Sequence, residues 1–301
     1  MIFSSNILKV YVGLFLAMLF WGFSFIATKY LLNVLKPISL VLIRLIISVI
    51  FLLILGKVFK LLDKIKPHHW KWFIILAFFE PFLYFVGETY GLKYVSATIG
   101  AIIISTIPLF VPWGAWIFFK EKIYWKNFLG IVISIFGVIL TLLNKNMEFS
   151  ASLLGIALVF IAVVSAISYT LIIRFFSKEY SALSIITYQN ILGIPMFIPF
   201  FFYFDYQNLS FDLIKFDLWI ILLWLGIFPS SLSYLFYTYS VQNIGVSKTS
   251  VFVNLIPVVT AVASYFLLKE EFTSVKFIGI LVVMLGLYIS QLKQNIYSNS
   301  V

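Results

Sequence analysis

Four ionisable side chains stand inside long apolar runs of this chain: Lys29, Arg44, Glu80 and Glu88. Charge inside hydrocarbon is costly, so such residues are candidates for solute binding or proton transfer. A helical rise of ~1.5 Å per residue places Arg44 ~10 Å and Glu88 ~6 Å below the outer surface of the bilayer, at depths that allow the two side chains to pair. Glu80 falls ~18 Å down, near the midplane, with no cation predicted at its own depth. We therefore expect Glu80 to exchange protons.

Each of these residues also has a structural interpretation that the sequence leaves open. Arg44 and Glu88 either form an ion pair that fixes helix packing or face a substrate. Lys29 either extends to the outer headgroups or points towards a cavity. Glu80 is either a proton carrier or a neutral group that is hydrogen-bonded to a neighbouring helix.

The composition indicates that lipid surrounds the elements that carry these residues. Of the 301 residues, 63% are hydrophobic and 11% are charged, whereas a soluble domain is about half apolar and a quarter charged. The net charge of +10 does not indicate a nucleic-acid partner, because the basic residues lie in short loops between apolar runs. Ten runs approach the ~20 apolar residues that cross a bilayer. We predict helices over 8–29, 37–56, 71–92, 95–119, 126–143, 152–174, 182–204, 217–241, 246–268 and 275–292.

The second half of the chain repeats the first at a constant offset of 149 residues. This offset carries Pro108 onto Pro257 and Lys120-Glu121 onto Lys269-Glu270. Duplicated hydrophobic helices are typical of secondary transporters, whose substrate site lies between the repeats. The repeat predicts a first five-helix unit at 1–145, a second at 150–292 and a short cytoplasmic tail at 293–301.

The distribution of basic residues predicts how these helices are oriented. With the N-terminus inside, thirteen Lys and Arg residues fall on the cytoplasmic side and seven on the outer side, so we expect both termini in the cytoplasm. Five helices per unit is an odd number, and the second unit must therefore enter the membrane inverted. The predicted fold is an all-α membrane protein with ten transmembrane helices as two inverted five-helix repeats.

Matched prolines predict bends near the site. Glu80-Pro81 aligns with Pro229-Ser230, near the midpoints of the third and eighth helices, while Pro108 and Pro257 are matched in the fourth and ninth. Proline frees a carbonyl and kinks a helix, and freed carbonyls are tolerated at membrane depth only beside protein or a water-lined cavity. The four prolines either shape the bundle or act in gating.

Aromatic and amide side chains complete the predicted substrate site. Alongside the four ionisable residues we expect Trp21, Tyr84, Tyr234, Tyr237 and Asn254 to contact the substrate. Aromatic walls with few charges suit a small amphipathic or zwitterionic solute. A phosphate ester would require clustered Lys and Arg in both halves of the chain. We expect no metal site, since the chain has no cysteine and adjacent histidines on a helix do not face one metal.

Several motifs resemble the drug/metabolite transporter superfamily, EamA-type. Phe20-Trp21-Gly22-Phe23-Ser24-Phe25 followed by Lys29 is similar to its first helix. The run 91–98 resembles its corner between the third and fourth helices. Pro108, Lys120-Glu121, Gly130 and Gly137, with their repeats in the second half, resemble its fourth and fifth helices. The resemblance implies a central cavity lined by helices 1–4 and 6–9, with Trp21 and Lys29 towards it.

These features predict a secondary transporter in the cell inner membrane that exports small metabolites such as amino acids by alternating access. Protons are the hypothesised coupling ion, and the oligomeric state stays open. The alternative is an uptake or exchange carrier for another organic solute, such as a sugar or a phosphorylated metabolite. A membrane-embedded enzyme is disfavoured, because HExxH, a nucleophile elbow and cysteine are missing from the sequence. We therefore expect neither catalytic residues nor a cofactor.

Overall fold

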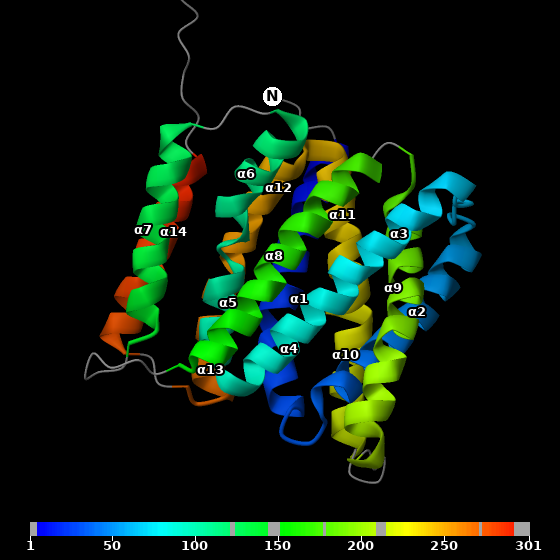
Figure 1. Cartoon of the computed structure of the whole chain (residues 1–301), viewed down its shortest axis with the longest axis horizontal. Coiled ribbons are helices and arrows are strands. Elements are labelled where there is room, and N and C mark those ends of the chain that lie inside the picture. The colour runs from blue at the N-terminus through cyan, green and yellow to red at the C-terminus, as the bar shows by residue number, and fades with distance from the viewer. Residues whose placement is uncertain are drawn as a thin grey trace, which may run out of the picture.

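The structure, a computed structural model, describes residues 5–120, 124–143, 151–176, 179–208, 215–270 and 273–291. Within these residues the fold is all-α, a bundle whose helices run across the molecule side by side (Figure 1). The predicted tail, 293–301, and Glu121 of the repeated Lys-Glu motif lie outside the described residues.

The first half of the chain forms, in order, α1 (Ser5–Leu31), α2 (Pro37–Phe59), η1 (Pro67–His69), α3 (Trp70–Ala77), η2 (Phe78–Leu83), α4 (Tyr84–Tyr94), α5 (Ala97–Ile104), α6 (Ile107–Phe119) and α7 (Trp125–Thr141). The second half forms α8 (Leu153–Phe176), α9 (Ala182–Phe200), η3 (Phe201–Asp205), η4 (Tyr206–Asn208), α10 (Phe216–Ile227), η6 (Phe228–Leu232), α11 (Ser233–Ile244), α12 (Val246–Ser250), η7 (Val251–Asn254), α13 (Leu255–Leu267) and α14 (Ser274–Gln291).

Eight of the described helical stretches are long and apolar enough to cross a membrane. They are Ile7–Leu31, Pro37–Phe59, Pro67–Tyr94, Ala97–Phe118, Leu153–Phe176, Ala182–Asp205, Phe216–Ile244 and Lys248–Leu267. The remaining two predicted spans, 126–143 and 275–292, correspond to shorter apolar helices, Trp125–Thr141 and Ser274–Ser290.

Two of the long stretches are interrupted by π-helical turns at positions that the repeat matches. η2 lies between α3 and α4, and η6 lies between α10 and α11. Pro81 and Pro229 explain both interruptions, because proline lacks an N–H group and its ring clashes with the preceding turn. Glu80 has φ −137° and ψ 115°, outside the helical region. The structure thus shows a break in helical geometry before Pro81, as predicted, and a π-helical turn at Pro229.

Pro108 and Pro257 occupy a different kind of position. Pro108 lies in the first turn of α6, directly after the break at Ser105 and Thr106, and Pro257 lies in the first turn of α13, after η7. The first turn of a helix tolerates proline, since its N–H group has no partner within the helix. Each of these two prolines therefore lies at the start of a new helix, directly after a break in the chain's helical structure.

Helices from the two halves pack against each other in pairs. α4 lies along α8, α1 along α11, α2 along α9, and α7 along α14. A Cβ atom on Gly130 would lie 2.5 Å from the carbonyl oxygen of Gly286, and one on Gly137 would lie 2.9 Å from that of Gly279. Because residues increase along α7 as they decrease along α14, the two helices are antiparallel, and they form one edge of the bundle (Figure 1).

Aspartates join α2 to α9 at both ends. Asp205 Oδ2 accepts hydrogen bonds from the backbone N–H (2.7 Å) and the hydroxyl (3.0 Å) of Ser39, near the start of α2. Asp63 Oδ2 accepts from the backbone N–H of Ser181 at 2.7 Å, and its own N–H donates to Ser184 Oγ at 2.7 Å, at the start of α9. Burial alone would raise the pKa of Asp63, but hydrogen bonds from Ser181 and Ser184 outweigh burial, so its pKa is lowered.

Candidate functional site

A narrow cavity lies inside the bundle, and its walls come from both halves of the chain. The side chains that line it are Trp21, Ser24, Phe25, Arg44, Glu80, Tyr84, Phe85, Glu88, Ile104, Ile107, Ala166, Tyr169, Thr170, Tyr234, Tyr237, Val253 and Ile256. Seven of the nine residues that the sequence suggested for substrate contact belong to this set. Its polar groups lie among aromatic rings and aliphatic side chains.

Glu80 is joined to the opposite half of the chain through Tyr234. The tyrosine hydroxyl donates a hydrogen bond to Glu80 Oε1, and Glu80 is only 1% exposed. The bond connects η2, one of the two matched interruptions, with α11, which directly follows the other, η6. The sequence predicts no cation at the depth of Glu80, and in the structure Arg44 lines the same cavity.

Carbonyl groups at both interruptions are bonded by side chains from other helices. Trp21 Nε1 on α1 donates to the carbonyl oxygen of Pro229 at 3.1 Å, and Ser165 Oγ on α8 donates to that of Phe79 at 2.5 Å. Polar backbone at this depth needs such partners, because the surrounding lipid offers none. Trp21 thus acts both as a cavity wall and as an anchor for η6.

Arg44 is the cation of the cavity, and its contacts leave one part of the guanidinium unpaired. Nε donates to Ser230 Oγ at 2.8 Å, and the guanidinium carbon lies 4.2 Å from the centre of the Phe85 ring. Nη1 lies 4.0 Å from Glu88 Oε2, so the expected pairing is present as a long contact. Neither Nη1 nor Oε2 has a hydrogen-bond partner. Glu88 Oε1 accepts from the Tyr84 hydroxyl at 3.4 Å.

A hydrogen-bonded network of neutral groups surrounds Ser230, the residue that accepts from Arg44. Ser48 Oγ donates to the carbonyl oxygen of Ser230 at 3.1 Å and lies 2.7 Å from Ser231 Oγ. Asn190 Nδ2 on α9 donates to Ser48 Oγ at 2.9 Å. The network ties α2, α9 and η6 together behind the guanidinium, and so restricts the positions that Arg44 can adopt.

The two remaining predicted residues lie outside the cavity lining. Lys29 Nζ donates to the carbonyl oxygens of Leu92 (2.5 Å) and Val95 (2.8 Å), at the end of α4. It thereby occupies acceptors that a helix end leaves free. Asn254 is buried, and its Oδ1 has no hydrogen-bond partner.

Sequence reasoning did not include Tyr169 or Ser230 among the predicted substrate contacts. Tyr169 on α8 packs edge-on against Tyr234, with ring centres 6.0 Å apart, and lines the cavity. Ser230 binds Arg44 from η6. A signal for Ser230 existed in the repeat, because the offset of 149 carries Pro81 onto it. The signal for Tyr169 was its place in a polar run of the sixth predicted span, beside Ser165, Ser168 and Thr170, but 17 tyrosines in the chain made it inconspicuous.

A bundle in which eight of the described helical stretches are long and apolar enough to cross a membrane is the architecture of a multi-pass membrane protein. The chain matches the EamA-like transporter family over residues 8–143 and 153–292. It therefore belongs to this family, and the family and the names of its relatives point to a membrane transporter of the drug/metabolite type rather than to an enzyme.

Individual relatives agree with this assignment. A protein of Archaeoglobus fulgidus named an uncharacterized transporter is 32% identical over 94% of this chain and 98% of its own length. The uncharacterized transporter YetK of Bacillus subtilis is 26% identical over 73% of this chain and 68% of its own length. One crystal structure superposes with a TM-score of 0.71 at 14% identity, covering 94% of this chain and 98% of the other. At that identity the similarity concerns the fold.

Proposed function

We propose that the protein is a secondary transporter that exports a small zwitterionic metabolite, such as an amino acid, across the cell inner membrane by alternating access. The carrying observation is the pair of opposite charges in the cavity, Arg44 and Glu88, each with an unpaired polar atom. A carboxylate is suited to the free Nη1, and an ammonium group to the free Oε2. Their 4.0 Å separation leaves the pair without a mutual hydrogen bond.

The walls favour a solute with an apolar portion. Trp21 lies edge-on to Tyr234, with ring centres 5.1 Å apart, and tilted against Tyr237 at 5.4 Å. Aromatic faces and edges bind apolar groups and ammonium ions. Among the described lining residues, Arg44 is the only cation. A doubly charged phosphate ester would be better served by several cations, so the cavity favours the zwitterion over a phosphorylated solute.

Alternating access requires two units that move relative to each other, and we assign them to 1–145 and 150–292, the second inverted. Support comes from α7 and α14, the fifth helix of each proposed unit, which pack antiparallel through matched glycines. The pairing of α4 with α8 is likewise mirrored by that of α11 with α1. Glu80 and Tyr234 belong to different units. Their hydrogen bond is one that a relative movement of the units would break.

Protons are the proposed coupling ion, with Glu80 as the carrier. The side chain is buried beside the opposite unit and lines the cavity that the substrate would occupy. The four prolines are assigned to gating: Pro81 and Pro229 at the π-helical turns, Pro108 and Pro257 at the restarted helices. In the proposed orientation both termini are cytoplasmic.

Reconstituted protein tests the proposal directly. Liposomes preloaded with a single unlabelled amino acid should accumulate the same labelled amino acid by counterflow, and a panel of neutral, acidic and basic amino acids would give the preference. Glu88→Gln in the same assay should abolish counterflow of a zwitterion. If sugars or phosphorylated solutes exchange while no amino acid does, the zwitterion assignment is wrong although the protein remains a carrier.

A further inference from the structure

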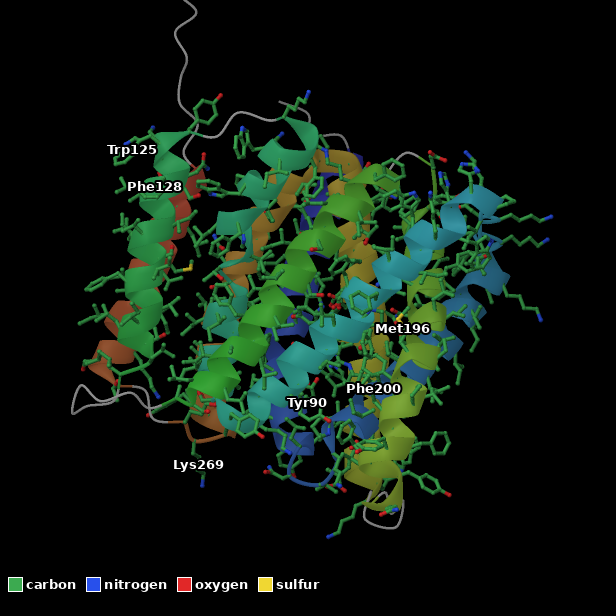
Figure 2. The ribbon with its side chains drawn as sticks, in the orientation of Figure 1. Tyr90, Trp125, Phe128, Met196, Phe200 and Lys269 are labelled. Atoms are coloured by element: carbon green, nitrogen blue, oxygen red, sulfur yellow. The ribbon has the colours of Figure 1, made fainter. Side chains whose placement is uncertain are left out.

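The corner between α2 and α3 carries a dense group of exposed lysines: Lys57, Lys60, Lys64, Lys66 and Lys71. Asp63 is the only acidic residue in this segment, and its carboxylate is bonded to the start of α9. Lys66 pairs with Glu179 at 2.7 Å. The other four have no ion pair within the part of the chain that the structure describes. Figure 2 shows nitrogen-tipped side chains extending outward from this corner of the bundle.

The fold alone does not account for this cluster. In the second half of the chain, the connection between the second and third spans is residues 205–217, which contain three aspartates and one lysine. The two halves of the chain thus have equivalent connections, 57–71 and 205–217, whose net charges are opposite in sign. The lysine cluster is a property of one face of the molecule.

Exposed apolar side chains accompany the lysines. Val58, Phe59 and Leu61 are 66%, 62% and 54% exposed, and Trp70 and Trp72 are 42% and 37% exposed. Lysines mixed with exposed aliphatic and tryptophan side chains are typical of a segment at the boundary between headgroups and acyl chains. Four of these five side chains lie at the facing ends of α2 and α3, and Leu61 lies in the connection between the two helices.

Hydrogen bonds hold the segment in one arrangement. The Ser181 hydroxyl donates to the carbonyl oxygen of Leu61 at 3.1 Å, and the Tyr188 hydroxyl donates to that of Asp63 at 3.0 Å. The backbone N–H of Lys66 donates to the Tyr180 hydroxyl at 3.1 Å. Because the backbone is already fixed, a ligand that binds the lysines orders little beyond their side chains.

We propose that this corner is a binding surface for anionic phospholipids, with Lys57, Lys60, Lys64 and Lys71 contacting the headgroup phosphates. Ammonium groups attract phosphate as point charges, and lysines gathered beside a membrane span attract anionic lipid. The exposed aliphatic and tryptophan side chains would contact the adjoining acyl chains. The proposal concerns a surface away from the cavity and does not depend on which solute is transported.

Lipid retention by purified protein tests this proposal. Protein in detergent is incubated with equimolar phosphatidylglycerol and phosphatidylcholine of identical acyl chains, and bound lipid is counted by native mass spectrometry. We expect the wild type to retain phosphatidylglycerol over phosphatidylcholine by about tenfold. The preference should weaken as salt is raised, through screening. Millimolar inorganic phosphate should displace little, since it offers no acyl chains. Displacement by phosphate alone would overturn the assignment to a lipid.

Matched variants separate a lipid site from a general effect of positive charge. K57Q/K60Q/K64Q should lose most of the preference, whereas K93Q/K215Q/K269Q removes equal charge from exposed lysines elsewhere and should keep it. Each of the two glutamine variants also changes one lysine with left-handed backbone geometry, since φ is 53° at Lys60 and 54° at Lys269. K57R/K60R/K64R should retain the preference, because arginine keeps the positive charge, and an unchanged Tm of K57Q/K60Q/K64Q would exclude misfolding as the cause of its loss. Absence of any preference in the wild type would show that the lysines bind no anionic lipid, and equal losses in both glutamine variants would show a general effect of positive charge; either result would overturn the proposal.

Discussion

Replacing one member of the Arg44–Glu88 pair by glutamine should destabilise the protein strongly, and replacing both should restore much of the loss. Arg44 is 2% exposed and Glu88 is 4% exposed, so neither charge has access to bulk water. Opposite charges about 4 Å apart attract by about 4 kcal/mol at an effective dielectric constant of ~20. Removing one partner of a buried pair leaves the other uncompensated, at a cost of roughly 3–5 kcal/mol.

The two single variants differ in the contacts that remain to the residue left without its partner, and this difference predicts which variant is less stable. In Glu88→Gln, the guanidinium keeps its bond to Ser230 and its contact with Phe85. In Arg44→Gln, Glu88 keeps only the 3.4 Å bond from the Tyr84 hydroxyl. Glu88 can however accept a proton and become neutral, whereas arginine cannot lose one. Glu88→Gln should therefore be the more damaging change.

Thermal unfolding of detergent-purified protein measures the effect. At ~2 °C per kcal/mol for a chain of this size, the single changes should lower Tm by roughly 6–10 °C, and the double variant should lie above Glu88→Gln. A Tm change for the double variant equal to the sum of the single changes would mean that the two residues do not interact. Single variants with unchanged Tm but no transport would show that the pair contributes to substrate binding alone.

Three further predictions concern topology, proton coupling and acid stability. Reporter fusions at positions 62 and 210 should report the cytoplasm and the outside respectively, and a common side for both would contradict the inverted repeat. Glu80→Gln should keep the fold and substrate binding but make flux in liposomes independent of an imposed pH gradient; a response equal to that of wild type would exclude Glu80 as the proton carrier. Asp63 has a lowered pKa in the folded protein, so its stabilising bonds are fully present above the unfolded pKa of about 3.9 and are lost as pH falls through the folded pKa. Asp63→Asn should thus lower Tm at neutral pH, with the curves of variant and wild type converging in acid, and a constant difference across pH would refute the linkage.

The sequence predicted the helical spans and the charged residues of the cavity better than its hydrogen-bond partners. Long apolar runs have few alternatives to helix in lipid, and a charge such as Arg44 within one is conspicuous. Pro81 and Pro229 marked the interruptions because proline acts on backbone geometry locally. Lys29 was less tractable: the acceptors it reaches, at Leu92 and Val95, are backbone carbonyls of another helix. Every residue has a backbone carbonyl, so the residue type does not indicate which carbonyls a helix end leaves without a partner.

Hydroxyl partners were the least predictable feature. Ser, Thr and Tyr are common in this chain, and many satisfy themselves on their own helix, as Thr187 does by donating to the carbonyl of Leu183 at 2.7 Å. Ser230 and Tyr169 differ from such residues only in what lies opposite them in the folded bundle. That information arises from contacts between distant segments, and a periodic pattern along one helix does not contain it.

The aspartates at the two ends of the α2–α9 pair constrain how the protein can move. Parting these helices at either end would strip Asp63 or Asp205 of its hydrogen bonds to the start of the opposite helix. The hydrogen bonds of the two aspartates therefore tie α2 to α9 at both ends, and one of these helices belongs to each half of the chain. Separating the pair at either end costs these bonds, so α2 and α9 form one connected element that links the two halves of the bundle.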